Sequence, residues 1–568
     1  MRYILDIETD NLYNDVTTVH CCVMRNVDTQ EVLTFDGTTV RDCIPLMENA
    51  DQLIGHNLLA YDLPVLKKLW GWDYEGDVLD TLVCSRTIWP NMLELDAKSK
   101  KLPSKSWGSH ALKAWGYRLG ELKGDFNDGS TEVWDVYTQE MLDYCVQDTL
   151  VTLRLLERIE AKGFSKDALD LEHKIAYEMF QQEQQGFEFD VKGAERLYSE
   201  LAHRKQMIED ELQSTFEPTI VELKTKTKVI PFNPSSRQQI ADRLIKRGWK
   251  PTETTPNGDP KVDDNVLAGI DLPEAKLLSE YLMLNKRLGQ VATGKQGWLK
   301  VQQNGKLHGR VNHMGAVTSR CTHSNPNLAQ VPSLGAPYGA ECRSLFTVPT
   351  GYNLLGADAS GLELRCLAHY MALYDDGAYG REVLEGDIHT ANQLAAGLPT
   401  RSNAKTFIYG FLYGAGDAKI GAIINKGAKE GKKIKNKFLA KTPALKKLRD
   451  AVSKAAERGW IKGLDGRRIP VRHAHASLNT LLQSAGAIIC KRWYALIVDA
   501  LQANNYTSED VTIVAFVHDE VQVQVKKGLE DKVGELITNA MRETERYYNF
   551  RCPLDSEYSV GSTWKDTH

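Results

Sequence analysis

The sequence lacks several patterns that point to particular classes of protein. Its 568 residues include ten cysteines, which are scattered and form no Cys-x-x-Cys pair. Neither a zinc cage nor a disulfide framework is therefore predicted, and the thiols are expected to be reduced and mostly buried. No apolar run approaches the roughly 20 residues that span a bilayer, so no membrane is expected as a partner. The first residues also lack the apolar segment and cleavage site of a secretory signal, which predicts an intracellular protein.

An excess of positive charge, expected of a protein that binds nucleic-acid phosphates, is also missing. The net charge is −5, but the two parts of the chain differ. Residues 1–160 hold 27 acidic and 15 basic residues, a balance of −12, which leaves the remainder at about +7. An asymmetry of this size indicates that the two parts have different functions.

The apolar pattern divides the chain into several domains, as expected because single cores stop growing near about 250–300 residues. Over the first 160 residues short apolar strands alternate with helical stretches such as 139–159, which predicts an α/β domain. From 166 to 216 the chain is amphipathic and helix-forming, with a short extended piece at 186–190. Beyond residue 309, strands with acidic ends flank a helical insert at about 387–457, which predicts an α+β domain.

Two acidic clusters in the C-terminal part follow predicted strands. Asp358 comes directly after an apolar run, and Asp519 and Glu520 lie at the turn between two further runs that are typical of a β-hairpin. Either cluster alone is also consistent with an ordinary polar turn. Together they predict a shared site, because carboxylates on rigid strand ends can hold two metal ions about 3.5–4 Å apart for an in-line displacement.

Between these clusters, cations and aromatic rings recur every four residues. Arg401, Lys405, Tyr409 and Tyr413 have the spacing that places side chains on one face of a helix. A solvated basic face above core aromatics would show the same spacing. Carboxylates for metals and a cationic helix for phosphates are what nucleotidyl transfer requires.

A second set of carboxylates lies in the acidic N-terminal part. Asp6 and Glu8 are two residues apart on a predicted strand, so both side chains point to one face. Tyr144 and Asp148 share one face of a predicted helix, and Asp62 follows another apolar stretch. Asp6 and Glu8 alone would be a weak signal, but the full set predicts a second metal site.

The C-terminal blocks, in this order and wording, resemble motifs A, B and C of the family A (polymerase I type) DNA polymerases, most closely the replicative polymerases of short-tailed, T7-like bacteriophages. The N-terminal set resembles the DEDDy 3′–5′ exonucleases. The resemblance implies an α/β, RNase H-like exonuclease domain followed by an α+β right-hand polymerase domain. The implied boundaries are exonuclease 1–160, thumb and connecting helices 161–300, palm 301–386 and 466–568, and fingers 387–465.

The resemblance also implies roles for particular residues. In the polymerase domain it implies metal binding by Asp358, Asp519 and the backbone carbonyl of Ala359, with Glu520 nearby as a secondary catalytic residue. Nucleotide contacts are implied for Arg401, Lys405, Tyr409, His389 and Glu363, the last of which would crowd a ribose 2′-OH. DNA contacts are implied for Arg320, Gln483, His518 and Tyr413.

In the exonuclease domain the resemblance implies that two metals are held by Asp6, Glu8, Asp62 and Asp148. Tyr144 would orient the attacking water. Because the motif has no lesion, active proofreading is expected.

Cofactors and partners follow from the same resemblance. Two Mg²⁺ per active site are expected, since oxygen ligands and a phosphate substrate suit this ion, and Mn²⁺ would also fit. The expected partners are primer-template DNA, dNTPs, and a phage helicase-primase and single-stranded DNA-binding protein, in the cytoplasm of an infected bacterial host. Only residues 217–231, which include Lys224, Lys226 and Lys228, stand where phage relatives carry a thioredoxin-binding insertion. We therefore expect that thioredoxin does not bind.

Two other functions are compatible with parts of the pattern. A single-subunit RNA polymerase shares the palm and a lysine in motif B, but Glu363 and the exonuclease block argue against it. A non-catalytic DNA-binding subunit would keep the fold, but such subunits normally lose the metal carboxylates that are all present here.

Overall fold

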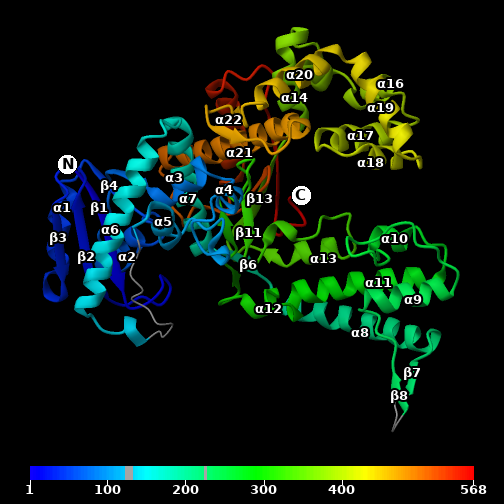
Figure 1. Ribbon diagram of the computed structural model, residues 1–568, viewed down its shortest axis with the longest axis horizontal. Coiled ribbons are helices and arrows are strands. Elements are labelled where there is room, and N and C mark those ends of the chain that lie inside the picture. The colour runs from blue at the N-terminus through cyan, green and yellow to red at the C-terminus, as the bar shows by residue number, and fades with distance from the viewer. Residues whose placement is uncertain (122–131, 223–226) are drawn as a thin grey trace.

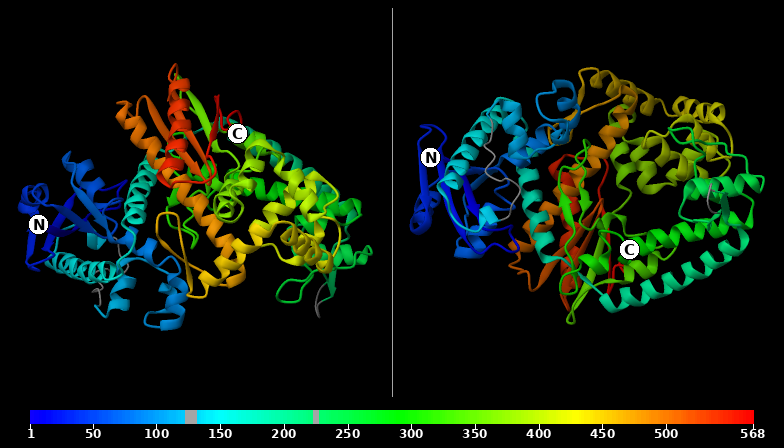
Figure 2. Two further views of the ribbon diagram at one scale, coloured as in Figure 1. Left: turned by 90° about the horizontal axis from the view of Figure 1, so that it is seen from above. Right: turned by 60° about the horizontal axis from the view of Figure 1, so that its bottom comes forward.

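The computed structural model describes residues 1–121, 132–222 and 227–568. Figure 1 shows an N-terminal unit at one side, a central sheet, and two helical arms that leave the central sheet on its far side. Figure 2 shows from two further directions that the N-terminal sheet lies at the end of the molecule away from both arms.

The N-terminal unit is built on a five-stranded sheet with the order β3-β2-β1-β4-β5. β1 and β3 run antiparallel to β2, and β4 and β5 continue the sheet parallel to β1. The strands are β1 (Arg2–Thr9), β2 (Val19–Asn26), β3 (Val32–Asp36), β4 (Gln52–Gly55) and β5 (Asp77–Asp80). The helices are α1 (Ile44–Glu48), α2 (Asp62–Trp70), α3 (Thr81–Ile88), α4 (Met92–Ser99), α5 (Leu112–Leu119) and α6 (Gln139–Glu160).

α6 is the predicted helix over 139–159, and it packs against β1 and β2. It begins where Thr138 adopts an extended conformation and its hydroxyl accepts a hydrogen bond from the Met141 N–H at 3.2 Å. The buried residues of α6 recur at helical spacing, which fixes the face that it turns to the sheet.

The predicted break at 186–190 separates two long helices, α7 (Lys166–Gln185) and α8 (Val191–Thr215). Gly186, at φ +68°, ends α7, and β6 (Phe187–Phe189) then pairs with β9 (Lys306–Leu307) and β12 (Phe346–Thr347). α8 starts the α8–α11 arm, residues 191–288. This arm also contains β7 (Thr219–Glu222), β8 (Thr227–Ile230), α9 (Arg237–Lys246), α10 (Asp264–Ala268) and α11 (Pro273–Leu288).

The segment 217–231 contains two antiparallel strands, β7 and β8, which pair with each other. Lys228 is exposed on β8, while Lys224 and Lys226 lie outside the described residues. A two-stranded ribbon so small carries no core of its own, and it projects from the far end of the arm (Figure 1).

The central sheet has four antiparallel strands in the order β16-β17-β13-β18. These are β13 (Tyr352–Ala359), β16 (Val511–Val517), β17 (Glu520–Lys526) and β18 (Ser556–Gly561). The hairpin predicted around Asp519 and Glu520 therefore forms, from β16 and β17. The helices close to it in sequence are α12 (Trp298–Val301), α13 (Gly339–Ser344), α14 (Leu362–Asp375), α15 (Ala378–Glu385), α21 (Ser477–Ala503) and α22 (Glu530–Tyr547). Two further hairpins join β10 (Arg310–Asn312) to β11 (Thr322–Ser324) and β14 (Trp460–Lys462) to β15 (Arg468–Pro470).

The predicted helical insert forms the second arm, named here the α16–α20 arm, residues 388–456. It contains α16 (Ile388–Ala396), α17 (Arg401–Leu412), α18 (Asp417–Ala422), α19 (Ala428–Lys441) and α20 (Pro443–Ala456). Thr400 begins α17, because its hydroxyl accepts from the Asn403 N–H at 3.1 Å.

Within the described residues, the stretch Ala474–Ala503 is long and apolar enough to cross a membrane by length and composition alone. Of its most apolar window, 78% is buried inside the molecule, where α21 packs against α7, α14, α20 and α22. This is the position of a core helix. The cysteines are free thiols, and all except the half-buried Cys321 are buried, as predicted.

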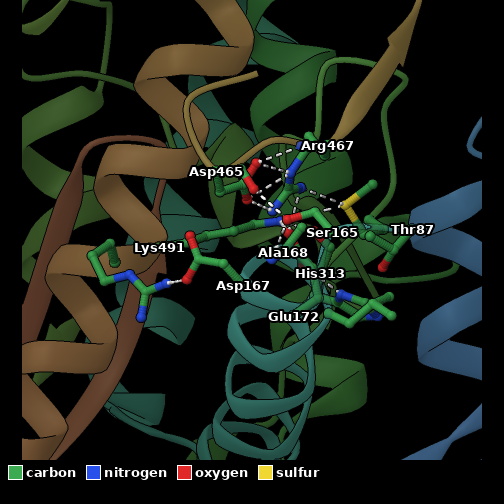
Figure 3. Close-up of polar contacts among 12 residues, drawn as sticks. Thr87, Ser165, Asp167, Ala168, Glu172, His313, Asp465, Arg467 and Lys491 are labelled. Atoms are coloured by element: carbon green, nitrogen blue, oxygen red, sulfur yellow. Dashed lines mark hydrogen bonds and ion pairs between the residues drawn. The ribbon is translucent and has the colours of Figure 1, made fainter. Parts of the chain in front are cut away.

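A buried cluster of charges joins α7 to the central domain (Figure 3). Glu172 on α7 accepts hydrogen bonds from Lys491 at 2.7 and 2.8 Å, from Arg467 at 2.7 Å and from His313 Nδ1 at 2.8 Å. Arg467 is also paired with Asp465 at 2.6 Å. Burial would raise the pKa of Glu172, but the charges of Lys491 and Arg467 hold it well below its ordinary value. The cluster is therefore charged, and two acids balance two bases.

Two buried histidines are expected to make the stability of the fold depend on pH. Burial lowers the pKa of both His313 and His369 to about 4, whereas an unfolded chain holds histidine near about 6.5. Between these values the unfolded state binds more protons, so stability is complete above about pH 6.5 and falls as the pH drops toward about 4. At pH 5 each histidine should lower the free energy of unfolding by roughly 1–2 kcal/mol, measurable as a lower urea midpoint than at pH 7.5.

His369→Asn should reduce this pH dependence, because the amide oxygen can still accept from the Arg551 N–H but does not titrate. His203→Asn, at an exposed position on α8, should leave it unchanged. An equal pH dependence in all three proteins would contradict the assignment.

Candidate active sites

The register of the central sheet brings the two C-terminal carboxylate clusters together. Asp358, near the end of β13, lies directly opposite Glu520, the first residue of β17. The Ala359 N–H donates to the Asp519 backbone oxygen at 3.0 Å, which ties the hairpin turn to the end of β13. His518 takes the left-handed conformation, φ +60°, that reverses the chain in this turn.

The carboxylates of Asp358, Asp519 and Glu520 are crowded together. Burial together with the charges of Asp519 and Glu520 raises the pKa of Asp358 to about 7. Burial and the charge of Glu363 raise the pKa of Asp519 to about 6. Carboxylates that repel one another in this way are stabilised by a cation, and all-oxygen ligands suit Mg²⁺ or Mn²⁺. The arrangement can therefore hold divalent metal and, through it, bind phosphate oxygens.

Glu520 differs from its neighbours because protein donors occupy both of its oxygens. Its Oε1 accepts from Trp564 Nε1 and from Gln522 Nε2, each at 2.5 Å, and its Oε2 lies 3.0 Å from His568 Nδ1. Burial alone would raise the pKa of Glu520, but these hydrogen bonds and the charge of His568 leave it lowered. Glu520 thus stays charged and fixes the C-terminal segment beside the site.

The cationic face of α17 looks across to α16. Arg401 is exposed and pairs with Asp387 at 2.8 Å, and Lys405 is exposed one turn later. The rings of His389 on α16 and Tyr409 on α17 have centroids 6.3 Å apart. Burial, and then the charges of Arg401 and Lys405, lower the pKa of His389, so it is neutral near pH 7. Two exposed cations and one neutral donor can contact a polyphosphate.

Glu363, in the first turn of α14, lies between α17 and the carboxylates of Asp358 and Asp519. The Tyr413 hydroxyl, just beyond the end of α17, donates to Glu363 Oε1 at 2.6 Å. The guanidinium of Arg320 lies 6.0 Å from the centroid of the Tyr413 ring. Gln483 is half-buried on α21, which is joined to α17 by a 2.6 Å hydrogen bond from Asn479 to the Leu412 oxygen.

A cavity of about 330 Å³ lies among these elements. It is lined by Arg320, Cys321, Leu362, Glu363, Tyr413, Leu482, Gly486, Ala487, Cys490, Lys491, Phe516, His518 and Asp519. The cavity thus meets residues of all three C-terminal blocks. No sequence pattern pointed to Lys491, which reaches the cavity wall from the buried cluster around Glu172.

In the N-terminal unit, Asp6 and Glu8 lie on one face of β1, as their spacing predicts. Cys145 on α6 joins them, and the ligand atoms of these three side chains lie within 4.8 Å of one another. The Cys145 thiol donates to Asp6 Oδ2 at 3.2 Å. No sequence pattern singled out Cys145, although it directly follows Tyr144.

Asp62 is the first residue of α2 and is buried beside β1, where it accepts a hydrogen bond from the Ile7 N–H at 3.2 Å. Burial raises its pKa to about 7. Asp148 is buried on α6, one turn after Cys145, and the ring of Tyr144 lies 6.4 Å from that of Trp134. Asp62 is thus tied to β1 through Ile7, and Asp148 lies on α6, which packs against β1. Among the described residues, however, the ligand atoms that lie together are those of Asp6, Glu8 and Cys145. Asp6 and Glu8 offer carboxylate oxygens that can hold divalent metal.

Comparison with known proteins identifies similar chains. Residues 199–566 match the model of DNA polymerase family A. The chain is 39% identical to a DNA-directed DNA polymerase of Enterobacteria phage T3 and 38% identical to one of Escherichia phage T7, each over 100% of both chains. It is 28% identical to a DNA polymerase I of Pseudomonas aeruginosa, over 59% of this chain and 39% of the relative.

A solved structure shares the fold. It is described as the POL domain of Pol1 from M. smegmatis in complex with DNA primer-template and dNTP. The TM-score is 0.77, the sequence identity is 18%, and the match covers 99% of this chain and 95% of that chain. The fold therefore persists although most residues differ.

Trp564→Phe should destabilise the protein, because it removes a hydrogen bond to a buried carboxylate and leaves Glu520 Oε1 with one donor fewer. The expected loss is roughly 1–3 kcal/mol beyond the loss of packing, measured by urea unfolding. Trp298→Phe is the matched control, since Trp298 belongs to the same apolar cluster and its indole donates no hydrogen bond within the described part of the chain. Equal losses in the two variants would show that the bond contributes nothing.

Proposed function

Because the chain belongs to DNA polymerase family A and is a DNA-directed DNA polymerase, we propose that it is a replicative enzyme with two active sites. One site extends a primer 3′ end by a two-metal mechanism, and the other removes misincorporated nucleotides as a 3′–5′ exonuclease. The observation that carries the synthetic function is the strand register that sets Asp358 beside the hairpin turn with Asp519.

In this proposal the central sheet, within residues 301–386 and 466–568, is the palm. The α16–α20 arm lies within the fingers, 387–465, and the α8–α11 arm within the thumb and connecting helices, 161–300. The N-terminal unit, 1–160, is the exonuclease domain with an RNase H-like fold. The element boundaries support the divisions at 160, 386 and 465, which fall between helices or strands, whereas the division at 300 falls within α12.

Asp358 and Asp519, with the backbone carbonyl of Ala359, would hold two Mg²⁺ ions, and Mn²⁺ fits the same oxygen ligands. Bound metal supplies Lewis acidity to the attacking 3′-oxygen and to the leaving pyrophosphate. The carboxylates must be ionised to bind metal. Their pKa values are raised by burial and by neighbouring acids, so a bound cation would stabilise their charged form. Glu520 keeps the turn in place through Trp564 and His568.

The α17 face would bind the incoming dNTP. Arg401 and Lys405 contact the triphosphate and stabilise the charge that moves to the leaving pyrophosphate, while neutral His389 donates a hydrogen bond to the same group. Glu363 excludes ribonucleotides, because the Tyr413 hydroxyl fixes its carboxylate and it cannot move aside for a 2′-OH. Tyr409 lies on the same face of α17 and would contact the sugar.

The exonuclease site would use the same kind of chemistry for hydrolysis. Asp6, Glu8, Asp62 and Asp148 hold two metal ions, and Tyr144 orients the attacking water. The strongest support is the shared face of Asp6 and Glu8 on β1, together with the buried Asp62, whose carboxylate accepts from the Ile7 N–H of the same strand and whose pKa is raised by burial.

Other partners follow from this function. Arg320, Gln483, His518 and Tyr413 would contact the primer-template DNA close to the new base pair. A phage helicase-primase and a single-stranded DNA-binding protein would act with the enzyme in the cytoplasm of the bacterial host. The small β7–β8 hairpin offers little surface for thioredoxin, so processivity would not depend on it.

Primer extension tests the synthetic function. With Mg²⁺ and a primed template, the enzyme should elongate with dNTPs and not with rNTPs. Asp519→Asn should reduce elongation by about 10²–10⁴-fold, because it weakens the binding of a metal ion that lowers the activation barrier by several kcal/mol. Glu509→Gln changes an exposed carboxylate before β16, at the end away from the turn, and should retain full activity. Elongation by Asp519→Asn at the wild-type rate would refute the assignment.

Trimming of a labelled single strand without nucleotides tests the exonuclease. The double variant Asp6→Ala, Glu8→Ala should abolish 3′–5′ degradation and spare elongation, because these carboxylates belong to the N-terminal site alone. The matched double variant Asp28→Ala, Glu31→Ala removes two exposed acids from the β2–β3 turn and should trim normally. Persistent trimming by the first variant would refute the site.

A further inference from the structure

A buried thiol lies against the carboxylates of Asp6 and Glu8 in the N-terminal unit. Cys145, on α6, is fully buried, whereas Asp6 and Glu8 on β1 are half-buried. The Cys145 sulfur lies 3.2 Å from Asp6 Oδ2 and 3.4 Å from the Asp6 backbone oxygen. The ligand atoms of the three residues also lie within 4.8 Å of one another. The thiol therefore belongs to the immediate surroundings of both carboxylates.

The thiol could act here as a hydrogen-bond donor or as a metal ligand. A buried thiol keeps its proton near neutral pH, because apolar surroundings disfavour the thiolate. Sulfur is also a soft ligand, whereas Mg²⁺ prefers oxygen. Both properties favour the donor role, in which the S–H bond points to an oxygen of Asp6. Because S–H is a weak donor, its effect comes from where it holds the carboxylate and not from the strength of the bond.

The residues behind Cys145 hold its sulfur in this position. Cys21, on β2, lies directly opposite Glu8 in the register of β1 and β2, so the two side chains point to the same face of the sheet. This face is covered by α6 (Figure 1), and Cys21, Val23 and Met141 form one apolar cluster with Cys145. A close-packed wall leaves the sulfur little freedom to turn away from Asp6.

The same contact ties α6 to β1 at the level of the carboxylates. Asp148 follows Cys145 by three residues on α6, and residues at this spacing lie on one face of a helix. A side chain that fixes α6 against Asp6 therefore also controls how Asp148 is placed relative to Asp6. Metal sites tolerate little error in such spacing, because their ligands have to be held within about 0.5 Å.

We propose that Cys145 is a positioning residue of the exonuclease site, where its S–H group holds the Asp6 carboxylate in the orientation that binds divalent metal. This inference rests on the proposed 3′–5′ exonuclease function. Loss of a group that orients a metal ligand typically costs about 10–100-fold in metal affinity or activity. Since a thiol is a weak donor, the loss expected here is at the lower end of that range, about 10-fold.

Direct metal binding tests this role without any reaction. Free Mn²⁺ is measured by electron paramagnetic resonance while the full chain is titrated, in an Asp519→Asn background that weakens the central site. The double variant Asp6→Ala, Glu8→Ala identifies the binding phase of the N-terminal site. In that phase Cys145→Ala should raise the Kd about 10-fold. Cys145→Ser should recover most of the affinity, because its hydroxyl can still donate to Asp6.

Three results of this titration would overturn the proposal. The first is an unchanged Kd in Cys145→Ala. The second is a Cys145→Ser variant that binds no better than Cys145→Ala, which would mean that the sulfur itself is required. The third is a double variant Asp6→Ala, Glu8→Ala that removes no binding phase, because the two carboxylates would then hold no metal for Cys145 to influence.

Cys43→Ala is the matched control for loss of a buried thiol. Cys43 is as buried as Cys145, lies in the same unit within the helical turn Gly37–Cys43, and donates to the Val40 backbone oxygen at 2.9 Å. Both alanine variants lose a buried sulfur and a weak hydrogen bond, so both should lower the urea midpoint. Only Cys145→Ala should change the Kd of Mn²⁺. Equal changes of that Kd would indicate a general loss of packing and would overturn the assignment.

Trimming of a labelled single strand gives a second readout, in the chain without the Asp519 substitution. In Cys145→Ala the Mg²⁺ concentration at half-maximal trimming should rise about 10-fold, and saturating Mg²⁺ should restore the rate. The KM for the strand should stay unchanged at saturating Mg²⁺, and elongation of a matched primer should be unaffected. A loss of trimming that Mg²⁺ does not restore would contradict a positioning role.

These readouts separate Cys145 from the function on which its role rests. If the wild-type enzyme extends primers but does not trim, the exonuclease function fails, while the Mn²⁺ titration still shows whether Cys145 orients Asp6. If the wild-type enzyme trims and Cys145→Ala leaves the titration unchanged, the role of Cys145 alone fails.

Discussion

The relative placement of the two candidate sites depends on one buried carboxylate, that of Glu172. It receives Lys491 from α21, Arg467 from the turn before β15 and His313 from the segment after β10. The next residue of α7, His173, accepts a hydrogen bond from the Asp80 N–H of the N-terminal unit at 2.8 Å. Adjacent positions of one helical turn thus hold the two halves of the molecule. Loss of one partner from a buried ion pair typically costs about 3–5 kcal/mol, so this junction resists rearrangement.

On either side of that junction the same electrostatic arrangement recurs. Asp62 in one site and Asp358 in the other both have a pKa raised to about 7, in each case first of all by burial. In both sites the ionised form of a buried carboxylate is unfavourable unless a cation is bound. In the central domain the opposite charge is on a separate element, since Arg401 and Lys405 stand exposed on the α16–α20 arm. The carboxylates at the end of the sheet and the cations of α17 thus lie on separate elements, which the hydrogen bond from Tyr413 to Glu363 connects.

The local pattern of the sequence was sufficient for the elements that carry chemistry. Alternation and turn residues located the β16–β17 hairpin, and helical spacing located α6 and α17. Contacts across long separations were not visible, because no periodicity reports on a partner some 300 residues away. Glu172 reads as one more polar residue of an amphipathic helix, and Cys145 as a core thiol. Likewise, nothing in the spacing of Trp564 indicates that its N–H is directed at Glu520.

The order of the strands in the central sheet also has a consequence for synthesis of the protein on the ribosome. β13 carries Asp358, but both strands that flank it, β17 and β18, come later in the chain. The N-terminal sheet is complete by residue 80, and its covering helix α6 by residue 160. At about 5–20 residues per second, the roughly 200 residues between β13 and the end of β18 take roughly 10–40 s to appear. During that interval β13 has no sheet neighbours, whereas the sheet and covering helix of the N-terminal unit have already been made. The nascent chain therefore gains the fold of its N-terminal unit well before that of its central domain.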